Sequence, residues 1–421
     1  MLTPVLGIIA EFNPLHNGHC YFIDQARKMG DFSAIICAMS GNFVQRGEAA
    51  ICNKWVRARM ALEAGVDLVV ELPFSSAVRS AFYFARGGIE LLYRTGVVTH
   101  LAFGSESGQL STLQTIARLL ASEPQAYKIQ LKTHLGQGLS FPAARAKAVH
   151  TILGSEIAAL DSILLQPNNI LALEYLRALH LTHASLLPIT IPRRGPGYNS
   201  TEMSSYASAT AIRQHLRSHP ADSSLADAMP ASAFNLLRQE IEAGRAPNYA
   251  DGLGSAVLSM LRTTPKERLS QIYEISEGLE NRIQEAANLS GSMEELTRSI
   301  KSKRYSSTRI NRLLLYMLLH IESRQMLGFD QVGPQYLHIL GFSTQGRKIL
   351  QEIKNKSSLR VLNRGSEVKA ASQDIDDPRV RGMLQLDVQA TDIYTLLYPR
   401  STARIGSRDF TTSPVIVGEH G

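Results

Sequence analysis

Short, nearly continuous apolar runs alternate with amphipathic stretches along the first half of the chain. Such runs are typical of parallel strands that are buried on both faces, whereas apolar residues that recur every three to four positions indicate helices. Each run is followed by one stretch of helical spacing, the order expected of successive strand-helix units. The predicted strands are residues 5–10, 34–39, 67–72 and 97–103, and the helices between them are residues 19–29, 54–64 and 77–95. The first half of the chain is therefore predicted to be α/β.

The elements that follow complete this domain and lead to a second one. Helices are predicted at residues 109–122, 142–153 and 169–179, then a strand at 187–192 and a helix that begins near residue 208. Residues 218–230 are rich in Ser, Ala, Asp and Pro, as in a surface connection. The stretch 231–352 is mostly helical in pattern, and after a mixed stretch a last helix is predicted at 388–397. We therefore predict an α/β domain over residues 1–217 and a mainly α-helical domain over residues 218–421.

Composition indicates a globular protein with a moderate basic excess. The chain has 421 residues, too many for one compact core, and 44% of them are hydrophobic. The net charge of +7 favours a polyanionic partner. Cys20, Cys37 and Cys52 lie in apolar surroundings and suit reduced, buried thiols and a cytoplasmic location. We expect no export signal and no membrane partner, because the apolar run at 3–12 is short and contains a proline and a glutamate.

The first predicted strand runs directly into a loop with the character of a phosphate site. Residues 11–19 read Glu-Phe-Asn-Pro-Leu-His-Asn-Gly-His, and helical spacing begins at their end. In open parallel sheets, ligands bind in the crevice outside the carboxyl ends of the strands. Pro14 restrains the loop, Gly18 permits a close backbone approach, and the free N–H groups of the following helix point toward any anion that enters.

Two histidines in this loop are candidates for catalysis. His16 and His19 are one helical turn apart, so both imidazoles can face one point. There they would donate hydrogen bonds to phosphate oxygens as charge builds during attack on an α-phosphate. The alternative is a pair of surface or metal-binding histidines. The preceding strand, the Asn-Pro pair and the intervening glycine favour the phosphate role, and no metal site is predicted.

A second element combines hydroxyl groups with an arginine at a helix start. Ser208 and Thr210 stand at the predicted start of the helix, and Arg213 follows one turn later. This arrangement suits binding of the β- and γ-phosphates of a nucleotide. The alternative is an ordinary N-cap with a solvated arginine, but the position at the end of an α/β domain that begins with His-x-Gly-His favours the phosphate role.

These two elements resemble the HxGH nucleotidyltransferase superfamily. Six further motifs narrow the resemblance to one family, the bacterial tRNA(Met) cytidine acetate ligases, over residues 5 to about 350. The motifs are MSGNFVQRG at 39–47, NKW at 53–55, GVDLVVELP at 65–73, FGSE at 103–106, PNNIL at 167–171 and the run 305–315.

The resemblance implies a Rossmann-like nucleotidyltransferase domain with a parallel sheet. It also implies that ATP, accompanied by Mg²⁺, activates acetate as acetyl-adenylate with release of pyrophosphate. The acetyl group then passes to N4 of the wobble cytidine in elongator tRNA(Met), which is the macromolecular partner. Carried over position by position, the ATP site comprises Gly7, Ile8, Ile9, Ala10, Glu11, Phe12, Asn13, Pro14, Leu15, His16, Asn17, Gly18, His19, Cys20 and Gly104, with Asn168 or Asn169 and Arg193 or Arg194.

For the asparagine and for the arginine of this set, the resemblance does not decide between two adjacent residues. Residues 192–198 read Pro-Arg-Arg-Gly-Pro-Gly-Tyr, where the family pattern has a single arginine followed by a small apolar residue. The guanidinium group of Arg193 or of Arg194 could bind phosphate in its fork geometry.

A polar loop follows the second predicted strand. Because it also lies at the carboxyl edge, it could contact acetate, the adenylate or the incoming cytidine. The alternative is a surface turn formed by Ser-Gly-Asn. Lys54 and Arg57, one turn apart, either add positive charge to the same crevice or form a solvated helix face. The candidate residues of the loop are Ser40, Asn42, Gln45 and Arg46.

A basic stripe with one aromatic residue lies in the second predicted domain. This combination suits single-stranded or looped RNA. An ordinary solvated helix face is the alternative, and the positive net charge favours RNA. The candidate tRNA-binding residues are Arg298, Lys301, Lys303, Arg304, Tyr305, Arg309 and Arg312.

Two other functions fit parts of the sequence. A small-molecule nucleotidyltransferase would use the same phosphate site without RNA, and the basic stripe argues against it. A non-catalytic RNA-binding or scaffold protein would not need His16, His19 and Arg213, which are all present. The oligomeric state and the group that accepts the cytidine amine proton stay open.

Overall fold

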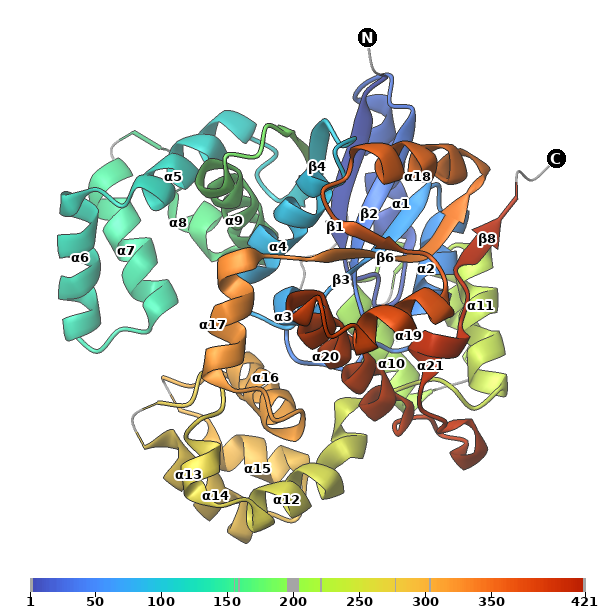
Figure 1. Ribbon diagram of the computed structural model, residues 1–421. Coiled ribbons are helices and arrows are strands. Elements are labelled where there is room, and N and C mark those ends of the chain that lie inside the picture. Colours follow the sequence, from blue (N-terminus) through green and yellow to red (C-terminus); the bar gives the residue numbers. More distant parts are fainter. Residues whose placement is uncertain are drawn as a thin grey trace.

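A single mostly parallel sheet forms the centre of the molecule (Figure 1). The computed structural model describes residues 3–154, 156–157, 160–194, 204–219, 222–276, 278–302 and 304–418. The sheet has eight strands in the order β5-β4-β1-β2-β3-β6-β7, and β8 pairs with β6. Its strands are β1 (Val5–Ala10), β2 (Ala34–Ser40), β3 (Leu68–Leu72), β4 (His100–Ser105), β5 (Leu187–Pro192), β6 (Tyr336–Ser343), β7 (Arg360–Leu362) and β8 (Val415–Val417). The predicted α/β class with a parallel sheet is confirmed.

Successive residues of the central strands face opposite sides of the sheet, and both sides are apolar. In β1, Leu6 and Ile8 pack with the helices on one face, whereas Val5 belongs to the core on the other face. In β2, Cys37 packs on the same face as Leu6 and Ile8, and Ile36 packs on the same face as Val5. The helices α1, α2, α10 and α11 contribute to the first core, and α4, α9 and α18 contribute to the second. This two-sided burial explains why the strands read as continuous apolar runs.

The helices surround the sheet and extend from it in two groups, one formed by α5 to α8 and one formed by α12 to α17 (Figure 1). Those up to the end of β5 are α1 (Asn17–Lys28), α2 (Lys54–Glu63), α3 (Phe74–Ala77), α4 (Ala81–Arg94), α5 (Leu110–Ser122), α6 (Gln125–Gly136), α7 (Phe141–Leu153), α8 (Leu160–Leu165) and α9 (Pro167–Thr182). The next are α10 (Ala209–Ser218), η1 (Ser223–Asp227), α11 (Ala231–Glu242), η2 (Ala250–Leu253), α12 (Gly254–Thr263), α13 (Lys266–Leu269), α14 (Leu279–Leu289), α15 (Met293–Ile300), α16 (Ser307–Leu318) and α17 (Ser323–Val332). The last are α18 (Thr344–Lys356), α19 (Gly365–Gln373), α20 (Pro378–Thr395), η3 (Ser401–Ala403) and α21 (Arg408–Thr411).

Three strands from the last quarter of the chain extend the sheet. Strand β6 pairs antiparallel with β3, and β7 and β8 pair parallel with β6. The sequence places β6 inside a stretch that reads as mostly helical, because a short apolar run has the same appearance in a buried strand and in a buried helix. The chain after residue 336 therefore returns to the first sheet, and the division at residue 217 stays a prediction.

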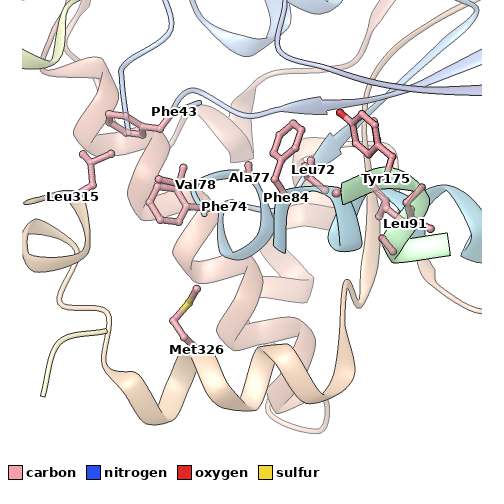
Figure 2. Close-up of a cluster of buried hydrophobic side chains, with 14 of the residues drawn as sticks. Phe43, Leu72, Phe74, Ala77, Val78, Phe84, Leu91, Tyr175, Leu315 and Met326 are labelled. Atoms are coloured by element: carbon pink, nitrogen blue, oxygen red, sulfur yellow. The ribbon is translucent and has the colours of Figure 1, made fainter. Parts of the chain in front are cut away.

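The helical group α12 to α17 packs directly against the loop that follows β2. Phe43 of that loop, Phe74 of α3 and Leu315 of α16 belong to one continuous cluster of buried side chains (Figure 2). Gly47, at φ +75°, lies so close to α16 that a Cβ atom there would be 2.5 Å from the Arg312 amide nitrogen. This contact fixes the helical group relative to the carboxyl edge of the sheet.

Candidate active site

The loop between β1 and α1 is held in shape by hydrogen bonds between its two histidines and its own backbone. His16 is the N-cap of α1, and its Nδ1 accepts a hydrogen bond of 3.1 Å from the Gly18 amide. The Nδ1 atom of His19 accepts a hydrogen bond of 3.3 Å from the His16 amide. The two ring centroids are 3.8 Å apart, so both imidazoles lie together at the start of the helix.

Both imidazoles are neutral hydrogen-bond donors toward the cavity. Burial lowers the pKa of His16 to about 3, and the Arg193 and Arg213 guanidinium groups lower it further. Burial, His16 and Arg193 hold the pKa of His19 well below its usual value. Because Nδ1 of each neutral ring accepts a hydrogen bond, the ring proton is assigned to Nε2. Each ring therefore presents an Nε2–H donor at the cavity.

A cavity of about 420 Å³ lies beside these histidines, at the carboxyl ends of β1 and β4. The strand order reverses here, because β2 and β3 lie on one side of β1, whereas β4 and β5 lie on its other side. This is the switch point at which open α/β sheets bind ligands. The predicted ATP-site residues that line the cavity are Ile9, Ala10, Glu11, Phe12, Asn13, His16, Gly18, His19, Gly104, Asn168, Arg193, Arg194, Ser208, Thr210 and Arg213.

The other residues of the predicted ATP site are not in the lining and belong to its surroundings. A Cβ atom at Gly7 would lie 2.9 Å from side-chain atoms of Leu92 and Val98, so this glycine permits close packing of α4 on β1. Asn17 donates hydrogen bonds of 2.9 Å to the carbonyl oxygens of Ser205 and Asp227, which join α1 to the segments around α10. The residues in this group are Gly7, Ile8, Pro14, Leu15, Asn17, Cys20 and Asn169.

The two adjacent asparagines have different environments. Asn168 lines the cavity, and its Oδ1 accepts a hydrogen bond of 2.7 Å from the Arg193 guanidinium group. Asn169 is buried, and its Oδ1 accepts hydrogen bonds from the amides of Glu106 and Ser107, at 2.9 and 3.1 Å. The geometry therefore favours Asn168 for ligand contact and Asn169 for holding the loop after β4.

Both adjacent arginines line the cavity, so the geometry retains both as candidates. Arg193 contacts Asn168 and lies close enough to the histidine pair to lower the pKa of both rings. The Arg194 guanidinium group lies over the rings of Tyr21 and Tyr206, 5.8 and 5.4 Å from their centroids. Residues 195–198 of the motif lie outside the described part of the chain.

Helix α10 starts at the cavity and carries the Ser-x-Thr-x-x-Arg element. Ser208 is its N-cap and accepts a hydrogen bond of 3.1 Å from the Ala211 amide. Arg213 donates to the Asn13 carbonyl oxygen at 2.9 Å and to Glu48 Oε2 at 3.1 Å. The arginine predicted to bind phosphate is therefore ion-paired with a glutamate that sequence analysis did not select.

The polar loop after β2 divides into two parts. Gln45 and Arg46 line the cavity. Ser40 and Asn42 are buried and are not in its lining. Asn42 Oδ1 accepts a hydrogen bond of 2.8 Å from the Lys54 amide, and Asn42 Nδ2 donates one of 3.2 Å to the Thr391 hydroxyl. Gln45 and Arg46 thus remain candidates for ligand contact, and Asn42 fixes the loop to α2 and α20.

A solvated helix face at Lys54 and Arg57 is contradicted, because both side chains are fully buried, and neither side chain is in the cavity lining. Arg57 donates to the carbonyl oxygens of Glu11 and Ser40, at 2.6 and 3.1 Å, and also to that of Gly41. It therefore joins the ends of β1 and β2 by hydrogen bonds to their carbonyl groups. Sequence spacing alone could not show that this helix face is covered.

Lys54 occupies a cluster of acidic and histidine side chains that would otherwise resemble a metal site. Within the described ranges, Glu71, His338 and Asp409 are the group of three spaced to hold a cation. The Lys54 ammonium group is already 2.7 Å from Glu71 Oε2 and 2.6 Å from Asp409 Oδ1. The donor set is thus satisfied by an internal ion pair, which joins α2 and β3 to the C-terminal region.

Two glutamates line the cavity, the predicted ATP-site residue Glu11 and Glu48, which the sequence analysis did not select. Glu11 accepts a hydrogen bond of 2.6 Å from the Gln45 amide, and burial raises the pKa of its carboxyl group. Glu48 is the partner of Arg213. The signal that could have identified Glu48 is its position two residues after Arg46, on the same carboxyl edge.

The three cysteines are free thiols rather than candidate nucleophiles. Cys37 and Cys52 are buried and Cys20 is partly buried. Burial raises the pKa of Cys20 to about 11 and of Cys52 to about 12, which disfavours the reactive thiolate.

The basic stripe is only partly exposed. Arg298, Lys301 and Arg304 are exposed, whereas Tyr305 and Arg312 are buried. Lys303 lies outside the described residues. The Arg309 guanidinium group lies 5.0 Å from the Tyr305 ring centroid. The ring is therefore covered by Arg309 and is not presented for stacking on a base.

No helix in the described part of the chain combines the length and apolarity needed to cross a membrane.

Comparison with known proteins gives concordant results. The family model described as HIGH Nucleotidyl Transferase matches residues 3–409. The chain is 54% identical to the tRNA(Met) cytidine acetate ligase of Syntrophomonas wolfei, over 98% of this chain and 99% of that protein. It is 41% identical to the protein of the same name from Acetivibrio thermocellus, over 98% and 100%.

Solved structures show the same similarity. The apo crystal structure of Thermotoga maritima TmcAL superposes with a TM-score of 0.93 at 35% identity, covering 99% of this chain and 100% of that one. The crystal structure of the same protein bound with alpha-thio ATP gives a TM-score of 0.91 at 34% identity, with the same coverage.

Proposed function

The chain belongs to the tRNA(Met) cytidine acetate ligase family of HIGH nucleotidyl transferases, and on that premise we propose that it is an ATP-dependent tRNA-modifying ligase. In the proposed reaction an acetate oxygen attacks the α-phosphorus of ATP, and pyrophosphate leaves. The acetyl group of the resulting acetyl-adenylate passes to N4 of the wobble cytidine in elongator tRNA(Met), and AMP is released.

The observation that carries the proposal is the group of donors around one cavity. The Nε2–H groups assigned to His16 and His19 lie at the start of α1, and Arg193 and Arg213 line the same cavity. Charge that develops on phosphate oxygens during adenylyl transfer would meet two neutral donors and two cations. Fixed donors of this kind stabilise a transition state without reorganisation at the moment of reaction.

The neutral state of the histidines suits this role. A histidine with a pKa near 3 stays uncharged at neutral pH, so it needs no change of protonation before ATP binds. A neutral imidazole is also a poor general acid, because the loss of its single ring N–H proton would leave an anion. We therefore assign both rings to charge stabilisation rather than to proton transfer.

Mg²⁺ is proposed to accompany the ATP phosphates. The carboxylates among the cavity-lining residues are Glu11 and Glu48, and each already has a partner, the Gln45 amide and Arg213 respectively. Mg²⁺ is commonly held by substrate phosphates with one or two carboxylates, so the phosphates would supply most of its ligands. We propose a cytoplasmic location, because the substrate is tRNA and the three cysteines are free thiols.

The first half of the reaction is tested by acetate-dependent exchange of labelled pyrophosphate into ATP without tRNA. We expect exchange that requires acetate and is unaffected by phosphorylated metabolites. Exchange that does not require acetate but requires a phosphorylated metabolite would instead support a small-molecule nucleotidyltransferase.

A further inference from the structure

A second cavity, of about 650 Å³, borders the nucleotide cavity. The two have Glu48, Thr210 and Arg213 in common, so these residues form the partition between them. The second cavity extends from this partition to α12, α15 and α16, in the helical group at the bottom of Figure 1. Its volume is within the range of sites that bind small molecules or single nucleotides.

The walls of the second cavity have the chemistry of a site for a nucleobase. One side is apolar and aromatic, with Tyr249, Val257, Met293 and Leu314 among its lining residues. Bases splayed out of single-stranded RNA are held by stacking on such surfaces. The Arg217 guanidinium group lies 4.5 Å from the Tyr249 ring centroid, so the apolar side chains beside that ring supply the rest of the contact surface for a base.

The rim of the same cavity carries the exposed end of the basic stripe. Arg298 and Lys301 line it, together with Arg217 on α10. Arg298 is paired with Glu294 at 2.6 Å, and Arg217 is paired with Asp251. Four cations and three carboxylates line the cavity in total, counting Arg213 and Glu48, which leaves a small positive excess toward a phosphate backbone.

Glu48 is the acid that lines both cavities. Its side chain is 37% exposed, and one oxygen, Oε2, is 3.1 Å from Arg213 Nη2. Glu11, the other carboxylate of the nucleotide cavity, does not line the second cavity and binds the Gln45 amide. A group that must act between an adenylate in the first cavity and a base in the second is therefore placed at Glu48.

We propose that the second cavity binds the acceptor cytidine, extruded from the anticodon loop, and that the Glu48 carboxylate accepts a proton from its N4 amine during acyl transfer. This inference rests on the proposed function. The N4 nitrogen attacks the carbonyl carbon of acetyl-adenylate, and the new C–N bond forms as the bond from that carbon to the phosphate oxygen breaks. The electron pair of the broken bond leaves with AMP, and one N4 proton passes to Glu48.

The same carboxylate would select cytidine. A glutamate oxygen accepts a hydrogen bond from the exocyclic amine of cytosine, whereas uracil presents an acceptor oxygen at that position. Two acceptors facing each other in a partly buried site disfavour binding, so uridine is excluded by the group that serves the reaction.

The experiment compares two products formed by Glu48→Gln. Hydroxylamine traps acetyl-adenylate as acetohydroxamate and does not require the second cavity, whereas labelled acetate on elongator tRNA(Met) requires both steps. Glutamine retains an oxygen that can accept the hydrogen bond from Arg213, but it cannot take a proton. We expect tRNA acetylation to fall by about a hundredfold more than acetohydroxamate formation does, as for loss of a general base.

Two further variants complete the test. Glu352→Gln makes the same chemical change on α18, outside the lining of both cavities, and is expected to leave both products unchanged. Lys301→Glu reverses a charge at the rim and should raise the KM for tRNA about tenfold without altering acetohydroxamate formation.

Each result has a defined meaning. Normal tRNA acetylation by Glu48→Gln, or an equal loss of both products, would overturn the assignment of Glu48 as the proton acceptor. An unchanged KM for tRNA in Lys301→Glu would overturn the assignment of the second cavity to the cytidine. Absence of acetate-dependent acetohydroxamate with the wild-type protein would overturn the proposed function itself.

Discussion

Replacing His19 separates its two roles, because one nitrogen supports the backbone and the other faces the ligand. Nδ1 accepts a hydrogen bond from the His16 amide at 3.3 Å, and the ring proton is assigned to Nε2. In His19→Asn, the amide oxygen can replace Nδ1 as the acceptor, but no donor remains at the position of Nε2. In His19→Gln, the longer side chain can place an N–H donor near that position.

The expected magnitude follows from the loss of one fixed donor. Removing a single donor to a developing oxyanion costs about 2.7–4 kcal/mol, or about a hundredfold to a thousandfold in kcat. We therefore expect His19→Asn to reduce acetate-dependent pyrophosphate exchange by at least about a hundredfold, and His19→Gln to retain more activity than His19→Asn. His19→Ala should lose the same activity and also about 1 kcal/mol of stability, because it removes the contact to the helix cap.

The assay is the initial rate of pyrophosphate exchange at saturating ATP and acetate, alongside urea denaturation of each variant. Equal stability of wild type and His19→Asn would show that the loss of rate is not a loss of folding. An exchange rate of His19→Asn within about threefold of wild type would refute the role of Nε2–H as a donor in the transition state.

Three other predictions concern stability and ligand binding. Lys54→Met should lower the free energy of unfolding by about 3–5 kcal/mol, because it leaves buried carboxylates unpaired. Lys28→Met, which removes an exposed ion pair, should change the free energy of unfolding by less than about 1 kcal/mol. Equal effects of the two substitutions in urea denaturation would contradict the buried ion pair. Asn168→Ala should raise the KM for ATP about tenfold with little effect on stability. Asn169→Ala should instead cost about 1–3 kcal/mol of stability, because it leaves two amides without an acceptor. A loss of stability in Asn168→Ala and a raised KM in Asn169→Ala would contradict both assignments. Because burial lowers the pKa of His16 to about 3 from 6.5, its neutral form stabilises the fold fully above pH 6.5 and this stabilisation is lost as pH falls toward 3. Between pH 7.5 and 5 the wild type should lose about 2 kcal/mol more than His16→Asn, and parallel curves would show that this ring titrates normally.

Much of the fold follows directly from apolar periodicity. The strands at Val5–Ala10 and Leu187–Pro192 have the predicted bounds, and β2 and β3 differ by one residue at one end. Strands β1, β2 and β3 are mostly buried, whereas β5 lies at the edge of the sheet with Leu187 and Pro192 exposed. The predicted helix at 77–95 is instead divided into α3 and α4.

The errors in the fold arise where sequence neighbours do not determine the environment. Strand β6 (Tyr336–Ser343) is apolar at a length that suits a strand or part of a helix, and only its pairing with β3 decides between them. The sequence pattern does not predict helix α6 (Gln125–Gly136), because the apolar periodicity of this helix is weak. Tyr127 is its one buried side chain.

The candidate site was predictable in its centre and less so at its edges. The histidine pair and Arg213 do line one cavity, because each lies at the start of a helix on the carboxyl edge of the sheet. By contrast, burial of Arg57 depends on carbonyl groups from β1 and β2, and the covering of Tyr305 depends on Arg309 one turn later. The carbonyl partners of Arg57 are set by tertiary packing, whereas the contact between Tyr305 and Arg309 is a local one between residues four apart in the sequence.

The proposed acetate ligase activity is measured as transfer of label from radioactive acetate to purified elongator tRNA(Met). The reaction is run with and without ATP, and beside a transcript in which the wobble cytidine is replaced by uridine. We expect label on the tRNA only when both ATP and the cytidine are present. Absence of label on every tRNA, in a preparation that still binds ATP, would refute the acetate ligase activity.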